Sequence, residues 1–408
     1  MTMAMAAPTN ADWVEKKVGR SCNTIEDKSN HSIVSTSDND QLKTNKELIT
    51  TMAGAEKGRD FAKQVKLMQI GIDKRPIIVF YKLLNLKPYK EPNKYDEPKV
   101  MKMMKDFPEL CVEVYRYEAF VQNLIHPLHM LCALNASVNA IKLCIKCCQA
   151  ALYYDYSAIG APIHYACMYN TNFETIRYLV KKDCDALELP NTDQGMTPLH
   201  LAIQYEADFP TVAFLTDRCA VAATMEDHEN RMTPLHYAVT VAEPQLQIVE
   251  DLTEVCPEAC EQICQKGFTP LLLGIYRNID DAILRDLIVS NPKSVSIQIA
   301  SPNNSDRIVT TLRLAIEKKN NIKVITDLIR ADPSLVQVVD DYGNLPVHTA
   351  VEVRNTDMEL YQLLASRYSD GLEVENLDGL TPYQLAQQKL LQYPDIVEFL
   401  NPYEEIIE

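Results

Sequence analysis

The chain has 408 residues, of which 47% are hydrophobic and 24% are charged. These fractions are typical of folded proteins and exclude disorder along the whole chain. Only 11 residues are Gly, against 22 Pro, which leaves few phosphate-cradling loops and disfavours a nucleotide-dependent enzyme. The net charge of −16 is uneven: residues 1–60 carry −1, residues 61–105 carry +7 and residues 106–408 carry −22. So acidic a body disfavours a nucleic-acid partner, since such partners are held by neutralising phosphates.

The amino-terminal 60 residues are the first predicted element. They are rich in Ser, Thr, Asn and Asp and nearly lack aromatic side chains, so we expect a disordered tail over 1–60. The first residues lack the charged start and apolar core of a signal peptide, and no apolar run approaches the roughly 18 residues of a spanning helix. The sequence therefore predicts no transmembrane segment and a cytoplasmic or nuclear location. The 12 Cys are then expected to be reduced thiols.

Residues 61–123 are predicted to form a degenerate N-terminal capping repeat. Arg75 and Pro76 begin an apolar stretch that indicates a first helix, and residues 100–114 indicate a second helix followed by an alternating segment. The lysines of this region are interleaved with Leu, Ile, Phe and Tyr, which favours a solvated helix face. An intramolecular or partner-facing electrostatic role is the main alternative, and binding to an acidic membrane or nucleic acid is a further one.

From residue 124 onward a short phrase recurs eight times. Its clearest copies are Thr197-Pro198-Leu199-His200-Leu201-Ala202 and Thr233-Pro234-Leu235-His236-Tyr237-Ala238. The copies begin near residues 124, 159, 195, 231, 267, 308, 343 and 379, and the steps between the proline positions are 35, 36, 36, 36, 41, 35 and 36. Such regularity predicts a repeat array over 124–408.

Each copy encodes the same local structure. Thr before Pro is an N-cap residue followed by proline at the first helical position, where its missing N–H is not needed. A second amphipathic stretch follows a loop, as in Ile283-Leu284-Arg285-Asp286-Leu287-Ile288, and its apolar residues form one inward stripe. A short alternating segment and a turn such as Asp341-Tyr342-Gly343 close the unit. Two antiparallel helices and a hairpin-like turn are therefore expected per repeat.

The T-P-L-H-x-A phrase resembles the signature of the ankyrin repeats, whose period is near 33. The resemblance implies an all-α ankyrin-repeat solenoid of stacked helix-turn-helix units with hairpin-like turns. The period nearer 36 indicates a longer loop between the two helices of each unit. The copy around Thr311 lacks both Pro and His and follows the step of 41 residues, so we expect the weakest joint of the array there.

Several residues are predicted to be structural. The recurring His could suggest a metal site, but stacked helices lie about 8–10 Å apart whereas zinc ligands sit about 2 Å from one ion. We expect each His to bond backbone and to tie one repeat to the next. Cysteines such as Cys111, Cys144 and Cys260 are predicted to fill the core, with metal binding or redox sensing as the alternative. The predicted structural motif comprises Thr197, Pro198, His200, Thr233, Pro234, His236, Thr269, Pro270, Pro346, His348, Thr381 and Pro382.

The resemblance implies that a partner binds the hairpin tips and the inner helix of each unit. Carried onto this chain, those positions are rich in Tyr, Met and Phe, residue types that are enriched at the energetic centres of interfaces. Packing between repeats is the alternative use of the same side chains. The predicted partner-binding residues are Tyr165, Tyr169, Met196, Tyr205, Met232, Tyr237, Phe268 and Tyr276.

The function predicted from the sequence is non-catalytic protein recognition, by a scaffold or adaptor that binds a protein partner with a basic surface. No catalytic residue, metal ligand or cofactor is predicted, because no nucleotide-loop, hydrolase, zinc-protease or kinase motif occurs. A regulatory or inhibitory subunit of an enzyme is the nearest alternative. An enzyme with its site in the N-terminal region is the alternative from another class.

Overall fold

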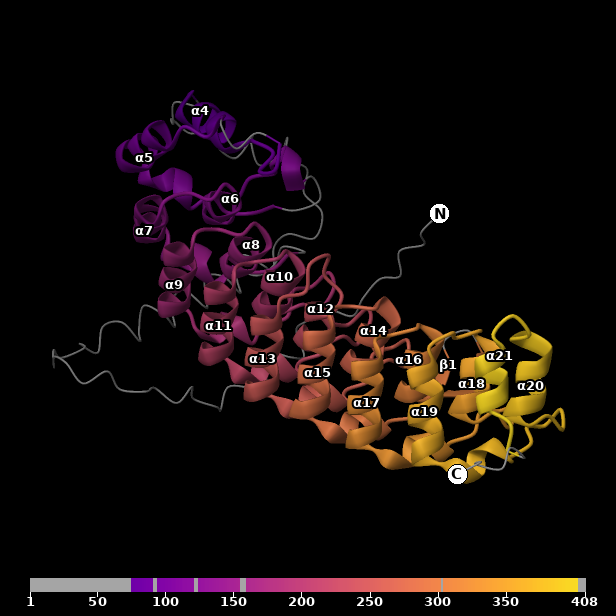
Figure 1. The fold of residues 1–408 in the computed structure, drawn as a ribbon. Helices are drawn as coiled ribbons and strands as arrows, with labels where there is room; N and C mark the ends of the chain where they lie inside the picture. Colours follow the sequence, from indigo (N-terminus) through magenta and orange to yellow (C-terminus); the bar gives the residue numbers. More distant parts are fainter. Residues whose placement is uncertain (1–74, 91–93, 121–123, 155–158, 302–303, 403–408) are drawn as a thin grey trace, which may run out of the picture. The chain divides into compact units, whose positions relative to one another are not determined.

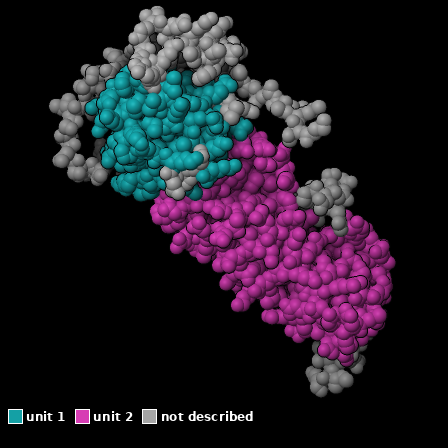
Figure 2. Space-filling model, turned by 90° about the horizontal axis from the view of Figure 1, so that it is seen from above, with its two compact units in different colours: residues 1–193 teal, residues 194–408 magenta. Residues whose placement is uncertain are grey.

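The computed structural model describes residues 75–90, 94–120, 124–154, 159–301 and 304–402. The chain forms two compact units (Figure 2), unit 1 over Met1–Asp193 and unit 2 over Gln194–Glu408. The predicted disordered tail over 1–60 lies outside the described residues. The regular structure is almost entirely helical (Figure 1), which confirms the predicted fold class.

Unit 1 consists of successive pairs of antiparallel helices separated by short 3-10 turns. A first pair stands where the sequence predicts a capping repeat, and its second helix is held at its start by the Asp96 side chain, which accepts the Lys99 N–H. The helices are α4 (Arg75–Leu84), α5 (Glu97–Asp106), α6 (Pro127–Ala133), α7 (Val138–Cys147), α8 (Pro162–Met168) and α9 (Phe173–Lys182). The 3-10 turns are η2 (Pro108–Cys111), η3 (Glu118–Phe120), η4 (Gln149–Tyr153) and η5 (Asp185–Leu187).

Helix α9 illustrates why these segments fold as they do. The Asn172 side chain accepts the Thr175 N–H at 3.0 Å and caps the helix start. The apolar stripe through Ile176 and Leu179 is buried, and Arg177 is exposed. A 10-residue helix is marginal alone in water, so burial of this stripe against neighbouring helices stabilises it.

Unit 2 continues the same alternation. The first helices of successive pairs pack on one another, and so do the second helices (Figure 1). The first helices are α10 (Pro198–Gln204), α12 (Pro234–Ala238), α14 (Pro270–Arg277), α16 (Thr311–Glu317), α18 (Pro346–Glu352) and α20 (Pro382–Lys389). The second helices are α11 (Phe209–Arg218), α13 (Leu246–Val255), α15 (Asp281–Ser290), α17 (Ile322–Ala331), α19 (Met358–Arg367) and α21 (Pro394–Phe399). The 3-10 turns are η6 (Ala220–Thr224), η7 (Pro257–Glu261), η8 (Pro292–Ser296), η9 (Pro333–Gln337) and η10 (Ser369–Leu372).

The step of 41 residues contains a β-hairpin. Strands β1 (Ile299–Ser301) and β2 (Asn304–Val309) pair in antiparallel register, with Ile299 opposite Val309. The sequence predicts only turn and loop structure here. The added residues extend the turn between two repeats, and the helix that follows still begins at Thr311.

The reversal between the two helices of a unit uses residues in the left-handed backbone region. Asn278, the C-cap of α14, has φ +54°. The residues at the same place in other units are Asn135, Asn170, Glu206, Lys319 and Arg354, all with positive φ. A non-glycine residue in this region is uncommon, so the recurrence shows that the unit's geometry imposes it. The low glycine content therefore does not prevent these sharp reversals.

Candidate protein-binding surface

The histidines of unit 2 join neighbouring repeats. His200 Nε2 lies 3.1 Å from the Met232 carbonyl oxygen, and His236 Nε2 lies 3.1 Å from that of Phe268. Since a carbonyl only accepts, Nε2 carries the proton, and Nδ1 of His200 accepts from the Thr197 hydroxyl at 2.8 Å. Burial lowers the pKa of both histidines to about 4. They are therefore neutral structural residues, as their spacing indicates.

The histidines of unit 1 make the same link without the threonine. His129 Nε2 lies 3.0 Å from the Tyr154 carbonyl oxygen, and His164 Nε2 lies 2.8 Å from that of Leu189. Their N-cap residues are His126 and Ala161, which offer no hydroxyl to Nδ1. The link between repeats is thus retained where the capping threonine is absent.

In the copy that lacks Pro and His, an arginine stands at the histidine position. The Arg313 guanidinium lies 2.7 Å from an Asp340 carboxylate oxygen of the next hairpin and 2.8 Å from Glu317. The side chains of Arg313 and Asp340 are nearly fully buried. Thr310 caps α16 by accepting the Arg313 N–H at 3.2 Å. A buried ion pair therefore replaces the histidine link at the joint where the sequence predicts weakness.

The remaining capping positions follow the predicted motif, with one exception. Thr269 and Thr381 are the N-cap residues of α14 and α20, and each side chain accepts the N–H of the third residue of its helix. Leu345 stands at the N-cap of α18, where the His348 ring instead accepts the Leu345 N–H at 3.2 Å. Proline occupies the first position of each of these three helices, and those residues are Pro270, Pro346 and Pro382.

The clustered cysteines lie in the helix interfaces. Cys111, Cys144 and Cys260 are buried, and burial raises the pKa of the Cys260 thiol to about 12. Hydrogen bonds from Cys144 and Cys147 lower the pKa of Cys111. Among the described residues no group of three or more His, Cys, Asp or Glu side chains is placed to hold a metal ion. These thiols contribute small apolar side chains to the core.

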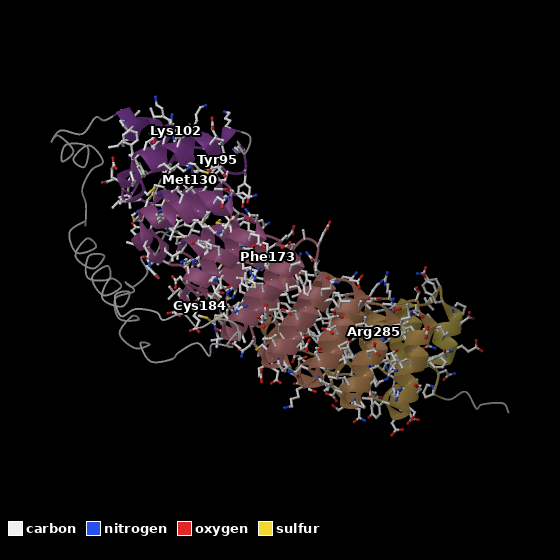
Figure 3. All side chains as sticks on the ribbon, turned by 90° about the vertical axis from the view of Figure 1, so that its left-hand side faces the viewer. Tyr95, Lys102, Met130, Phe173, Cys184 and Arg285 are labelled. Carbon is white, nitrogen blue, oxygen red and sulfur yellow. The ribbon has the colours of Figure 1, made fainter. Side chains whose placement is uncertain are left out.

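The lysines of the capping helix lie on its outer side. Lys99, Lys102 and Lys105 of α5 are exposed, whereas Val100 and Met104 are buried, and Lys102 is visible at the surface in Figure 3. The geometry is that of an amphipathic helix with a solvated basic face.

Four of the eight predicted partner-binding residues lie in the interior: Tyr165, Met196, Tyr237 and Phe268. The Tyr165 ring packs edge-on against Phe120 and His129, at 5.2 and 5.1 Å between ring centres. The Tyr237 hydroxyl donates to Asp227 at 2.9 Å and anchors the hairpin turn. Burial therefore assigns these four side chains to packing within and between repeats, because the space beside each inner helix is filled by its neighbour.

The other four predicted residues reach the surface. Tyr169, Tyr205 and Met232 are half-buried, and Tyr276 is 47% exposed. Lys318 lies over the Tyr276 ring at 3.9 Å from its centre, and the tilted Phe268 ring lies 5.5 Å from it between ring centres. Within unit 2, Tyr205, Met232 and Tyr276 lie on the inner-helix and hairpin side; we call them the inner-edge residues.

Two exposed side chains at the hairpin tips were not among the predicted contacts. Tyr342 is 50% exposed and Leu377 is 77% exposed, and the Leu377 N–H donates to the Tyr342 carbonyl oxygen at 2.9 Å. The signal in the sequence was an apolar residue beside Asp and Gly in a turn, at Asp341-Tyr342-Gly343 and Leu377-Asp378-Gly379. Asp and Gly predict a turn of the backbone there, but they do not predict that the neighbouring Tyr342 or Leu377 side chain is exposed.

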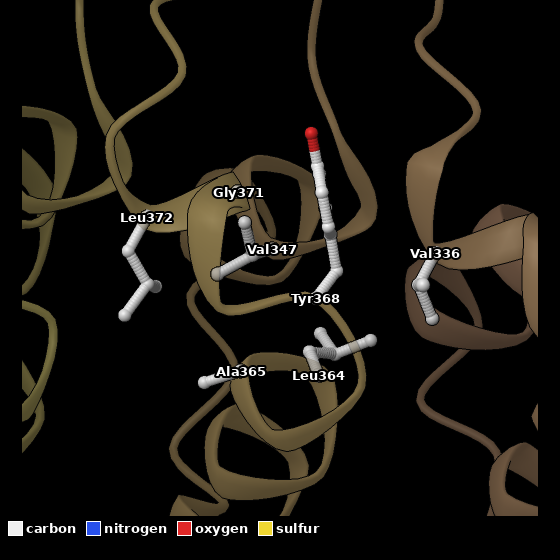
Figure 4. A pocket seen from close by; sticks show the side chains of 7 residues that line it. All are labelled: Val336, Val347, Leu364, Ala365, Tyr368, Gly371 and Leu372. Carbon is white, nitrogen blue, oxygen red and sulfur yellow. The ribbon is translucent and has the colours of Figure 1, made fainter.

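Two hollows lie among the described residues of unit 2, and neither is an enclosed site large enough for a ligand. A cavity of about 10 Å³ lies among Val336, Val347, Leu364, Ala365, Tyr368, Gly371 and Leu372 (Figure 4), and it is no larger than one water. An open groove of about 550 Å³ is lined by Arg231, Glu261, Gln262, Ile263, Cys264, Gln265 and Gly267. It is wide open to solvent, unlike the apolar clefts that bury small ligands. Among the described residues, no helix has the length and apolar character to cross a membrane.

Part of the repeat array matches a known family. Residues 128–222 match the model of ankyrin repeats, in three copies. No curated protein matches the sequence. One similar solved structure is that of a predatory endopeptidase from Bdellovibrio bacteriovorus in complex with its immunity protein, with 22% identity over 50% of this chain and 97% of that chain, at a TM-score of 0.40. Another is the ankyrin repeat domain of Bcl-3, a member of the IkappaB family, with 21% identity over 50% of this chain and 99% of that chain, at a TM-score of 0.37.

Proposed function

We propose that this chain, which is an ankyrin-repeat protein, is a non-catalytic scaffold or adaptor that binds a protein partner through the inner-edge residues of unit 2. Ankyrin repeats in general mediate protein–protein interaction. The observation that carries the proposal is the exposed Tyr276 ring, which contacts the buried Phe268 ring and has Lys318 over it. A rigid, supported aromatic side chain at the surface gives a large contact area at a small entropic cost.

The position of the inner-edge residues supports one continuous contact. Tyr205 is the C-cap residue of α10, and Tyr276 lies in the last turn of α14. Met232 directly precedes Thr233, the N-cap residue of α12. The three therefore come from consecutive repeats. Hot-spot residues cluster in this way near the centre of an interface. By contrast, Glu352 at the corresponding place of α18 is held by Lys389 at 2.7 Å.

The charge of the surface favours a basic partner. Residues 106–408 carry a net charge of −22, and Glu206, Glu229 and Glu243 are exposed around the inner-edge residues. Charge complementarity of this kind chiefly increases the association rate, and its effect falls as salt rises. We therefore expect capture to weaken strongly between low and physiological ionic strength.

The test is capture of the partner by the full chain from a native extract, with crosslinking mass spectrometry to identify it. The triple variant Tyr205→Ala, Met232→Ala and Tyr276→Ala should lose at least about tenfold in affinity, because truncating interface anchors typically costs 2 kcal/mol or more. The matched control is Val289→Ala. Val289 is 74% exposed on α15 and is not one of the inner-edge residues. Circular dichroism must show that both variants stay folded.

Two outcomes would contradict the assignment. If the triple variant retains the partner while Tyr342→Ala with Leu377→Ala loses it, the hairpin tips of the last repeats are the binding surface. If variants at Glu317 and Glu352 lose it instead, the contact lies on the charged inner helices of the C-terminal half. Inhibition of a captured enzyme by the full chain would identify a regulatory subunit rather than a scaffold.

A further inference from the structure

An exposed tyrosine of the capping region lies against the second repeat of unit 1. Tyr89 follows α4, and its ring stacks on that of Tyr169 at 4.7 Å between centres and 27° between planes. Its hydroxyl donates to the Met168 carbonyl oxygen at 2.9 Å. Even with these contacts, Tyr89 is 65% exposed. The side chain therefore sits on the surface of the repeat rather than in the core.

The contact does not belong to the packing of neighbouring repeats. Repeat arrays are built from contacts between adjacent units, as when the Thr171 hydroxyl donates to Cys132 over a separation of 39 residues. Tyr89 and Met168 are 79 residues apart, about two repeat periods. Tyr89 thus extends past the first repeat to the end of α8, which the regular stacking does not require.

The surface beneath Tyr89 has the properties of a site for one tyrosine. Tyr169 is the C-cap residue of α8, and the last carbonyl groups of a helix have no partner within it. Phe120 is buried and its ring stands edge-on to that of Tyr169 at 6.0 Å between ring centres, a contact that limits the movement of the Tyr169 ring. The site therefore offers a fixed aromatic face for stacking beside a helix-end carbonyl that accepts a hydrogen bond from a tyrosine hydroxyl.

We propose that this Tyr169 site is a docking position for a tyrosine-bearing peptide segment of a protein partner, and that the chain's own turn over 87–90 occupies it as an internal ligand. The inference deepens the proposed protein-binding function and rests on it. Tyr89 is flanked by Lys87, Pro88 and Lys90, so the internal ligand is a basic turn. A partner segment of the same chemistry, a tyrosine between lysines, is attracted to the acidic body as well.

The internal ligand and a partner segment compete for the Tyr169 site. A tethered segment faces its site at an effective concentration in the millimolar range. A free segment of equal intrinsic affinity must therefore reach millimolar concentration to displace it, and a partner that binds elsewhere on the chain at the same time can do so more easily. The turn over 87–90 thereby lowers the occupancy of the Tyr169 site by weak ligands.

The test uses a synthetic peptide with the sequence of residues 85–90 and the full chain, observed by saturation-transfer NMR on the peptide's tyrosine ring protons. Tyr89→Ala should raise the signal at least about fivefold over the unmodified chain, because the site is vacated. Adding Tyr169→Ala to Tyr89→Ala should remove the gain. Tyr89→Phe keeps the stacking ring but loses the bond to Met168, and it should give an intermediate signal. A peptide with Ala in place of its tyrosine is the matched control and should give none.

Equal signals from the unmodified chain and Tyr89→Ala would overturn the proposal, as would a gain that survives Tyr169→Ala. An unchanged far-ultraviolet spectrum and thermal midpoint of each variant show that the capping helices stay folded. Because the peptide is defined and the mutated residues lie in unit 1, failure here is distinguishable from failure of the capture test on the inner-edge residues of unit 2.

Discussion

The two units hold their repeat histidines differently. In unit 2, His200 and His236 each use both ring nitrogens, one toward a threonine hydroxyl and one toward the carbonyl of the next repeat. His348 of unit 2, which follows Leu345, has the Leu345 N–H at Nδ1 in place of a hydroxyl and keeps the carbonyl bond, to Leu380. In unit 1, His129 and His164 keep the carbonyl bond but face no capping hydroxyl. The bond between repeats is therefore the constant element of the motif, and the threonine is an addition that stabilises the helix start.

The largest expected effect comes from acid. Burial lowers the pKa of His126 and His164 to about 4 and that of His129 to about 3, from an unfolded value of 6.5. Because the folded chain holds these rings neutral, their stabilising contribution is complete above pH 6.5 and is lost as the pH falls toward 4. The free energy of unfolding should drop by several kcal/mol over this range.

The two units should differ in this acid response. The His126 and His129 rings lie 6.3 Å apart between centres, and the charge of His126 would further disfavour protonation of His129. Unit 1 should therefore open at a higher pH than unit 2. Hydrogen exchange read by mass spectrometry at a series of pH values measures this order. Simultaneous opening of both units, or the reverse order, would show that the additional buried ring of His126 beside His129 does not make unit 1 more sensitive to acid.

Arg313 provides the second test, because it makes the repeat link without a histidine. Arg313→Leu leaves Asp340 buried without its counter-charge, and breaking a buried pair in this way typically costs about 3–5 kcal/mol. Backbone N–H groups of Tyr342 and Asn344 still donate to Asp340, so we expect the lower end, about 3 kcal/mol, in urea unfolding. Glu317→Gln is the control, since Glu317 is one-third exposed and its pair is worth less than about 1 kcal/mol. Equal losses from the two changes would contradict the assigned link.

The smallest expected effect is that of the capping hydroxyl itself. Thr197→Ala removes the partner of His200 Nδ1 and should cost about 1 kcal/mol. The converse change, Ala161→Thr, places a hydroxyl beside His164 Nδ1 in unit 1 and should stabilise the chain by up to about 1 kcal/mol. Thermal unfolding of the two variants measures both effects. Destabilisation by Ala161→Thr would mean that the buried site has no room for the larger side chain.

The sequence by itself determined the repeat, its period and where the first helix of each unit begins. Caps, prolines and apolar stripes act over a few residues, so they can be recognised without knowing what lies beside them. The histidine role also followed from local spacing, because the ligand distances of a metal exclude neighbours one repeat apart.

Tertiary structure decided which aromatic residues face solvent. Tyr165 and Tyr237 occupy the same position of two repeat phrases, and Tyr169 is the C-cap of the helix that holds Tyr165. Their surroundings differ, because Tyr165 contacts Phe120 and His129, Tyr237 is bonded to Asp227, and Tyr169 stacks on Tyr89. Each outcome depends on a side chain supplied from outside the phrase, at separations from 10 residues for Asp227 and Tyr237 to 80 residues for Tyr89 and Tyr169. The replacement of histidine by the pair of Arg313 with Asp340 has the same origin, since Asp340 belongs to the next hairpin. The local sequence pattern determines whether a segment forms a helix. Which side chains are buried or paired depends on residues of other segments, which the local pattern does not contain.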